Sequence, residues 1–117
     1  MTHLVIVGGE IAGVVQFHEE NDPGYRHAGV DITLGDAFQD RGLGTAVLRR
    51  LIRYLIEERG HHRITIDPSV HNDRAIHVYR KVGFKPVGVM RRYERDPSGQ
   101  WSDGLLMDLL AEEFIES

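Results

Sequence analysis

The sequence predicts an α/β fold in which two helices pack against a mixed, mostly antiparallel sheet. The first observation is a loop with two glycines that follows an alternating apolar run and opens the most regular helix of the chain. The second is a further strand and helix directly after it, and the third is a hairpin pattern at either end of the chain. A strand, a helix and a strand in this order require a crossover, so the two strands should be parallel neighbours.

The part of the chain before the loop reads as three strands. Gly8-Gly9 predicts a hairpin turn between the first two, and Asn21-Asp22-Pro23-Gly24 is a strong turn signal before the third. In the third strand apolar and polar residues alternate, which places Asp31 on the face opposite the apolar side chains. The expected strands are residues 3–7, 11–18 and 28–34.

The loop before the first helix carries the clearest functional signal. Two glycines spaced in this way let the backbone approach a ligand closely, and the free N–H groups of the helix's first turn point at the same spot. Such an arrangement is typical of an anion-binding site. The following helix has a single apolar stripe, and Gly60 predicts its end in a left-handed cap. The loop reads Gln39-Asp40-Arg41-Gly42-Leu43-Gly44-Thr45, and the stripe consists of Val47, Leu48, Leu51, Ile52, Leu55 and Ile56.

Two common nucleotide-binding loops do not fit this stretch. A Walker-type phosphate loop needs a Gly-Lys followed by Ser or Thr, and this loop has no lysine. A dinucleotide fingerprint needs a third glycine where Val47 stands. An ordinary tight turn is the alternative that the loop alone leaves open.

The second half of the chain predicts a strand, a helix and a hairpin. The strand at residues 63–66 ends at Asp67-Pro68-Ser69, and the ligand sites of such sheets collect at this end of the strands. Asn72 or Asp73 caps a helix that runs to Val82 and stops at Gly83. The hairpin joins residues 84–92 to residues 101–110 around Asp96-Pro97-Ser98-Gly99.

Composition places the chain among ordinary globular proteins and excludes several kinds of chemistry. The 117 residues, 41% of them hydrophobic and 27% charged, predict a single domain over residues 1–117. No apolar run reaches the roughly 20 residues of a membrane span, so we expect no membrane partner and a cytoplasmic location. The net charge of −4 indicates no nucleic-acid partner, and the basic run at residues 91–95 is interpreted as a solvated hairpin edge.

The chain has no cysteine, so disulfides, thiol nucleophiles and cysteine-ligated metals are excluded. Among the seven histidines, His61 and His62 would point apart on a strand, while His71 and His77 lack helix-face spacing. We therefore expect no metal site.

The order of elements and two motifs resemble the GCN5-related N-acetyltransferase (GNAT) family from the family's second strand to its last. The loop matches that family's Gln-x-x-Gly-x-Gly acyl-CoA pyrophosphate motif. The stretch from Asn72 to Phe84 matches its second signature, Asn-x-x-Ala-x-x-x-Tyr-x-x-x-Gly-Phe. Gly29-Val30-Asp31 and Asp67-Pro68-Ser69 look most like the bacterial aminoglycoside 6′-N-acetyltransferases.

The resemblance implies an acetyl-CoA-dependent N-acetyltransferase with no metal. Acetyl-CoA would be the cosubstrate, its pantetheine arm paired with splayed strands near Thr33 and Ile66. The implied cofactor-binding residues are Gln39, Asp40, Arg41, Gly42, Leu43, Gly44, Thr45, Asn72 and Ala75. The alternative for Asn72 is that it serves only as a helix cap.

The resemblance also implies three catalytic residues and a small cationic amine as acceptor. Tyr79 would donate a proton, although its spacing alone fits a core tyrosine. Asp31 and Asp67 would bind the acceptor and relieve it of a proton, because an amine with a pKa of about 10 is mostly protonated at neutral pH. Asp67 before Pro68 also fits simple turn chemistry.

One departure concerns the acceptor side of the site. Family members usually carry a further strand and two helices before the point where this chain begins, and those helices wall the acceptor pocket. The chain could be a fragment, a naturally short member, or one that borrows the wall from a partner subunit. We expect a homodimer in which a second copy supplies the cover, through its carboxyl-terminal hairpin, with Trp101 and the residues from Leu105 to Leu110, and its tail at residues 111–115. A charged residue in place of Trp101 or Leu109 should then favour the monomer. The alternatives are a catalytically weak acyl-CoA-binding module, half of an assembly, or a protein N-terminal acetyltransferase.

Overall fold

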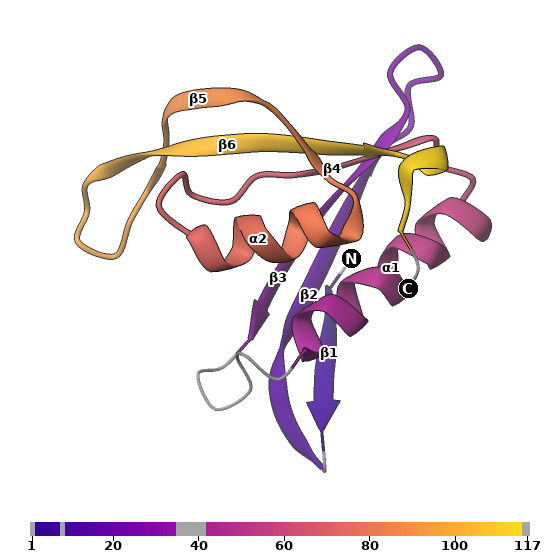
Figure 1. Cartoon of the computed structure of the whole chain (residues 1–117), viewed down its shortest axis with the longest axis horizontal. Helices are drawn as coiled ribbons and strands as arrows, with labels where there is room; N and C mark the ends of the chain where they lie inside the picture. Colours follow the sequence, from indigo (N-terminus) through magenta and orange to yellow (C-terminus); the bar gives the residue numbers. More distant parts are fainter. Residues whose placement is uncertain (1, 8, 35–41, 116–117) are drawn as a thin grey trace.

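The computed structural model describes residues 2–7, 9–34 and 42–115, which form one sheet and two helices (Figure 1). The elements are β1 (Thr2–Val7), β2 (Glu10–Glu20), β3 (His27–Leu34), α1 (Leu43–Glu57), β4 (Arg63–Ile66), α2 (Asp73–Val82), β5 (Lys85–Arg95), β6 (Trp101–Leu110) and the short 3₁₀ turn η2 (Ala111–Glu113).

The six strands lie in the order β1-β2-β3-β4-β6-β5. Every neighbouring pair is antiparallel except β3 and β4, which are parallel and flank α1 in the chain. The predicted α/β class, with a mixed and mostly antiparallel sheet, is therefore confirmed. The crossover through α1 accounts for the single parallel pair.

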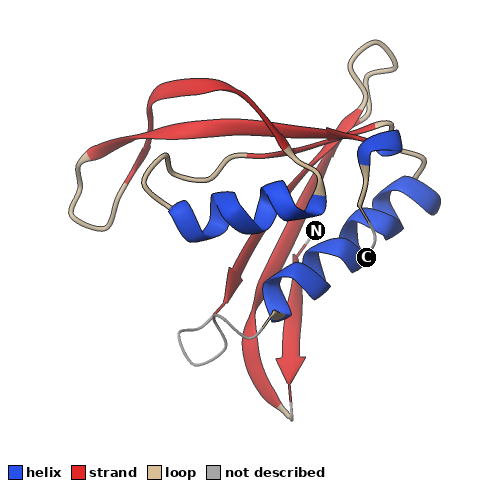
Figure 2. Cartoon of the chain, viewed as in Figure 1, coloured by secondary structure: helices blue, strands red, loops and turns tan. Residues whose placement is uncertain are grey.

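The core lies on one face of the sheet, under both helices (Figure 2). On β2 and β3 the buried side chains alternate with exposed ones, and the buried set of one strand pairs with that of the other, as at Phe17 and Val30. The helix α1 contributes the predicted stripe, of which Leu48, Ile52 and Leu55 are fully buried. The opposite face of β2 and β3 is left with polar side chains.

Both helices end as the sequence predicts. After α1, Gly60 adopts φ +70°, and the N–H of His61 donates to the carbonyl of Leu55 in the pattern of a Schellman cap. After α2, Gly83 has φ +124°, and a Cβ there would lie 2.6 Å from the carbonyl oxygen of Glu113. Only glycine fits at this second stop.

The carboxyl-terminal tail packs on its own chain. The N–H of Ile115 donates to the carbonyl of Val82 at 3.0 Å, and Arg49 Nε donates to the carbonyl of Ile115 at 3.0 Å. Leu109 is fully buried in the core. The expectation that Leu109 covers a second copy is therefore wrong, because its side chain is already used inside the monomer. Ile115 is 46% exposed, so the contact of the tail with a second copy stays a prediction.

The final hairpin differs from the prediction in its first strand. It turns at Asp96, whose Oδ1 accepts the N–H groups of Ser98 and Gln100. However, β5 continues three residues past the predicted end at Arg92 and carries an irregularity between Met90 and Glu94. β5 is also an edge strand, and almost all of its residues are exposed.

Candidate functional site

The two parallel strands separate soon after they pair. β3 and β4 are in register only at Ala28 with Ile64 and at Gly29 with Thr65. Beyond these pairs the chain of β3 continues to Leu34 while β4 ends at Ile66. The result is a wedge between the carboxyl ends of the two strands, where ligand sites in such sheets collect.

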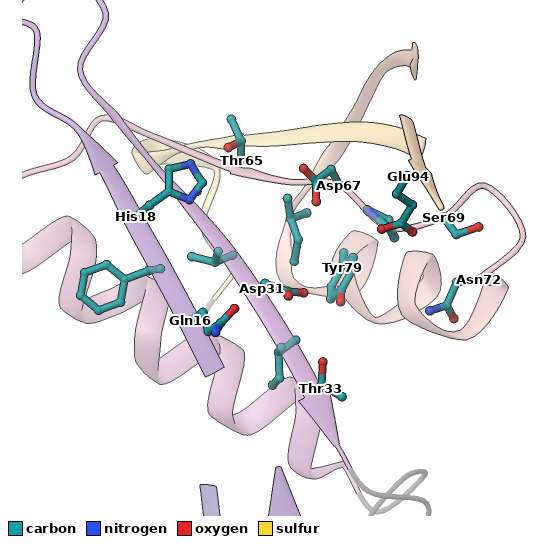
Figure 3. A pocket seen from close by; sticks show the side chains of 16 residues that line it. Gln16, His18, Asp31, Thr33, Thr65, Asp67, Ser69, Asn72, Tyr79 and Glu94 are labelled. Atoms are coloured by element: carbon teal, nitrogen blue, oxygen red, sulfur yellow. The ribbon is translucent and has the colours of Figure 1, made fainter. Parts of the chain in front are cut away.

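One cavity opens on the polar face of the sheet at this wedge, with a volume of about 510 Å³ (Figure 3). Asp31 and Thr33 reach it from β3, and Asp67 and Ser69 reach it from the chain after β4. Its other lining residues are Gln16, Phe17, His18, Gly29, Val30, Ile32, Thr65, Ile66, Pro68, Asn72, Tyr79 and Glu94. We call this space the polar cavity.

A second cavity, of about 530 Å³, lies between the end of β3 and the starts of α1 and α2. It includes the predicted cofactor-binding residues Gly42, Gly44, Thr45, Asn72 and Ala75. Its other lining residues are Ile32, Thr33, Leu34, His71, Asp73, Arg74, Val78 and Tyr79. We call this space the loop cavity.

The two cavities meet where the strands separate. Ile32, Thr33, Asn72 and Tyr79 line both of them. A ligand in the loop cavity and another in the polar cavity would therefore come together beside Tyr79. This geometry suits a reaction between two substrates that enter from different sides.

Tyr79 belongs to α2 and is buried, with its ring packed edge to face against Phe84 at 6.2 Å between centroids. Burial, together with the negative charges of Asp31 and Asp67, raises the pKa of Tyr79 to about 12. The phenol therefore stays protonated at neutral pH, and it is available as a donor at the junction of the cavities.

Three carboxylates lie around the polar cavity. Asp31 stands on β3 as predicted, exposed on the face away from the core, and Asp67 follows β4. Glu94, from β5, completes the group (Figure 3). The sequence analysis missed Glu94, because residues 91–95 were interpreted as a solvated hairpin edge.

Two further residues of the site were missed. The His18 ring lies over Gly29, where a Cβ would sit 2.2 Å from the ring, at the point where β3 and β4 begin to separate. The hydroxyl of Tyr93 donates to Asp67 Oδ2 at 2.5 Å. No pattern in the sequence indicates either contact, because each depends on the register of strands that are distant in the chain.

The described part of the glycine loop fits an anion. Gly42 is the N-cap of α1 at φ +70°, with open space where a Cβ would be, and no side chain caps the helix. The first N–H groups of an α-helix have no partner inside the helix, and those of α1 lie beside the loop cavity, which Gly42, Gly44 and Thr45 line. Thr45 is buried in the first turn. Gln39, Asp40 and Arg41 lie outside the described residues.

Asn72 has the predicted double position. Its side-chain oxygen accepts the N–H of Ala75 at 3.2 Å, which caps α2, and the same residue lines both cavities. Ala75 stands one turn into the helix and lines the loop cavity. Capping and ligand contact are therefore compatible at this helix end.

Two observations bear on other kinds of function. Within the described residues there is no group of three or more histidine or acidic side chains placed to hold a metal ion. Neither helix of the described chain is long and apolar enough to cross a membrane.

The chain is similar to known acetyltransferases. Residues 1–84 match the family model described as the acetyltransferase (GNAT) family. A kanamycin resistance protein of Rhizobium radiobacter is 41% identical over 75 residues, which cover 63% of this chain and 68% of that protein. An aminoglycoside N(6′)-acetyltransferase type 1 of Klebsiella pneumoniae is 35% identical over 100 residues, which cover 75% of this chain and 49% of that protein.

The fold is also similar to that of a solved structure. The acetyltransferase of GNAT family from Streptococcus pneumoniae superposes with a TM-score of 0.84 and 27% identity. The match covers 93% of this chain and 66% of that chain. The chain thus spans between about half and two thirds of the length of these relatives.

Proposed function

Because the chain belongs to the GNAT family of acetyltransferases, we propose that it is an acetyl-CoA-dependent N-acetyltransferase that acetylates a primary amine of a small cationic molecule. The observation that carries this proposal is the meeting of the loop cavity and the polar cavity beside the protonated phenol of Tyr79. A cationic acceptor is favoured by the three carboxylates of the polar cavity. Aminoglycosides are the first acceptors to test, since two relatives are named for them.

Acetyl-CoA supplies the acetyl group as a thioester when it is bound. The residues that would hold its pyrophosphate are Gly42, Leu43, Gly44 and Thr45 in the described chain, with Gln39, Asp40 and Arg41 before them. Asn72 and Ala75 would form the opposite wall. The open space at Gly42 supports this assignment, because a backbone without a Cβ lets an anion approach the amides closely.

The acceptor side of the proposal rests on charge. Asp31, Asp67 and Glu94 surround the polar cavity, and a carboxylate attracts an ammonium group strongly when both are partly removed from water. The amine must lose a proton before it can attack, and Asp31 or Asp67 accepts that proton directly or through water.

Tyr79 completes the proton balance. The ammonium group gives its first proton to Asp31 or Asp67, which passes it to solvent. During transfer the acceptor nitrogen loses a second proton and the departing sulfur gains one. The phenol of Tyr79 donates to the sulfur and is restored by the proton that leaves the nitrogen. Because burial and the negative charges of Asp31 and Asp67 hold the pKa of Tyr79 up, the donor is protonated at the start of each cycle.

The proposal also covers location and assembly. The proposed location is the cytoplasm, which a soluble thioester as cosubstrate and a soluble amine as acceptor suit. A homodimer is supported by exposed apolar side chains on the edge strand β5 and at the start of β6. These side chains are Val87, Val89, Tyr93 and Trp101.

A panel of amines tests the proposal. The purified chain is mixed with acetyl-CoA and either kanamycin, a linear polyamine, a neutral amine or a peptide with a free amino terminus, and thiol release and the acetylated product are measured. We expect turnover with the small cations, and loss of that turnover in Asp31→Asn but not in Glu57→Gln, an exposed carboxylate at the end of α1.

Other outcomes identify the alternatives. Turnover with the peptide alone would indicate a protein N-terminal acetyltransferase. Binding of acetyl-CoA by calorimetry with no turnover on any amine would overturn the proposal, and would identify an acyl-CoA-binding module or half of an assembly.

A further inference from the structure

Tyr93 reaches Asp67 across an intervening strand. Asp67 follows β4 and Tyr93 belongs to β5, while β6 lies between these two strands in the sheet. The Tyr93 hydroxyl nevertheless donates to Asp67 Oδ2 at 2.5 Å. The ring must therefore pass over β6 to make this hydrogen bond.

Glycine at position 104 makes the crossing possible. A Cβ at Gly104 would lie 2.8 Å from Cδ2 of Tyr93 and 3.2 Å from its Cγ. The backbone there has little freedom to move away, because Gly104 bridges to Ser69 and the N–H of Leu105 donates to the carbonyl of Pro68 at 2.7 Å. Tyr93 thus fills the space that a side chain on β6 would occupy.

A bulge in β5 places Tyr93 over that glycine. Met90 pairs with Gly104 and Glu94 pairs with Ser102, so three residues of β5 stand opposite the single residue Asp103 of β6. Arg92, inside the bulge, has φ +48°, which is uncommon for a residue other than glycine. Its N–H donates to Asp103 Oδ1 at 2.8 Å, and this bond offsets part of the conformational cost.

From these contacts we propose that Tyr93 is a positioning residue that fixes the carboxylate of Asp67 for the acceptor amine. The role rests on the proposed function, because it requires that Asp67 meets the acceptor. With Oδ2 held by Tyr93, the other oxygen, Oδ1, has no hydrogen bond to a described residue and is left for a cation in the polar cavity. Bulges of this kind are frequent beside active sites, where they re-aim a side chain.

The chemistry of the donor suits this task. The hydrogen bond to Asp67 raises the pKa of Tyr93 to about 12, with burial and the charges of Asp67 and Glu94 as further causes. The phenol therefore keeps its proton at neutral pH and can donate to Asp67. A tyrosine that only stabilises the fold would make the same hydrogen bond. The test therefore needs measurements that a purely structural role would leave unchanged.

The first measurement concerns the hydrogen bond itself. Ring-labelled tyrosine, assigned by Tyr→Phe variants, reports ionisation of each phenol by NMR. At a pH of about 10.5 the Tyr93 phenol should be largely un-ionised in the wild type and clearly more ionised in Asp67→Asn, because the variant loses the hydrogen bond to Asp67 and the charge of Asp67, two of the causes that raise the pKa of Tyr93 above the ordinary value of about 10. The signal of Tyr25, exposed in the turn before β3, should be the same in both. A Tyr93 phenol that ionises equally in both proteins would overturn the contact.

The second measurement concerns the acceptor. Tyr93→Phe should raise the KM for a cationic amine such as kanamycin by about 10-fold, the usual effect of losing one hydrogen bond to a charged group. The KM for acetyl-CoA should not change. In an Asp67→Asn background, Tyr93→Phe should cause no further loss, because the residue acts only through Asp67.

Glycine substitutions give a matched pair. Gly104→Ala should displace the ring and reproduce the kinetic change of Tyr93→Phe, whereas Gly88→Ala, on the neighbouring strand with open space around it, should not. Additive effects of Tyr93→Phe and Asp67→Asn, or equal changes in both KM values, would overturn the positioning role. If the wild type acetylates no amine, the proposed function fails and the positioning role with it, while the NMR result still decides whether the Tyr93 to Asp67 contact exists.

Discussion

His61 Nε2 lies 2.5 Å from Glu19 Oε2, and this pair ties the end of α1 to β2. The His61 side chain is completely buried, and Nδ1, its other ring nitrogen, makes no hydrogen bond with any described residue. Arg59 adds a second contact, with Nη2 at 3.0 Å from Glu19 Oε1. Glu19 is therefore the shared partner of a buried imidazole and a guanidinium, outside both cavities.

Removal of this shared partner should destabilise the fold. In Glu19→Ala the buried Nε2 of His61 loses its hydrogen bond, which should lower the free energy of unfolding by about 1–3 kcal/mol. Urea unfolding followed by circular dichroism measures the change. Glu57→Ala, at an exposed position of α1, is the control and should change the free energy of unfolding by no more than about 0.5 kcal/mol. An equal effect of the two variants would contradict the role given to Glu19.

The same site should make stability depend on pH in the acid range. The hydrogen bond from Arg59, followed by that from His61, lowers the pKa of Glu19 below its ordinary value of 4.5. A carboxylate whose pKa is depressed by folding stabilises the native state above its unfolded pKa, and this stabilisation is lost as the pH falls through the folded pKa. The contribution of Glu19 to the stability difference between wild type and Glu19→Ala should therefore be fully present well above the unfolded pKa of 4.5 and shrink as the pH falls below it. A difference that grows on acidification would exclude this origin.

The elements and their ends could be predicted from local signals. Gly60 and Gly83 stop the two helices because each adopts a positive φ that other residues avoid, and Asn72 caps α2 with its own side chain. The parallel pairing of β3 and β4 followed from the order strand, helix, strand alone. These features depend on residues that are close in the sequence, where pattern and structure are directly linked.

The contacts that were missed depend on register between distant segments. Tyr93 meets Asp67 only because a bulge in β5 coincides with a glycine in β6, and His18 covers Gly29 only through the pairing of β2 and β3. The prediction for Leu109 was wrong for a related reason. An apolar residue in a hairpin can face the core or a partner, and only the register of β6 with β4 places it inside.

A side chain in the glycine loop should weaken acetyl-CoA binding without unfolding the chain. Gly42 has open space around its missing Cβ, and a Cβ at Gly44 would make only an ordinary contact of 3.4 Å with Leu34. The larger valine side chain of Gly42→Val or Gly44→Val should obstruct the anion, with some extra backbone cost at Gly42 from its positive φ. We expect at least about 10-fold weaker binding by calorimetry, the effect of about 1.4 kcal/mol. Gly88→Val, on the exposed edge strand, is the control, and wild-type affinity in folded loop variants would refute the assignment.

Tyr79→Phe should separate catalysis from packing. The variant keeps the edge-to-face contact with Phe84 and removes only the hydroxyl. If the phenol donates the proton, kcat should fall by about 10²-fold or more while the affinity for acetyl-CoA changes little. Steady-state assays of thiol release measure kcat, and calorimetry measures the affinity for acetyl-CoA. Normal turnover in Tyr79→Phe would show that the hydroxyl does not donate the proton. Tyr79 would then be a core residue that lines both cavities.

The homodimer prediction now rests on β5 and the start of β6. Val89 and Trp101 are 58% and 59% exposed, and the backbone of an edge strand is open to pairing with another chain. Symmetric pairing of two copies is the commonest way in which soluble chains cover such surfaces. Light scattering at micromolar concentration should therefore give about twice the chain mass of 13.3 kDa.

Substitution of Trp101 tests the surface itself. Trp101→Glu should shift the equilibrium toward monomer, because it places a charge where an apolar side chain would be buried. Tyr25→Glu, at a 76% exposed position in the turn before β3, is the control and should leave the mass unchanged. Leu109 is unsuitable for this purpose, since a charge in the core would unfold the chain instead of separating two copies. A wild-type chain that stays monomeric at the highest soluble concentration would rule out this dimer, and Val89 and Trp101 would then be solvent-exposed residues of a monomer.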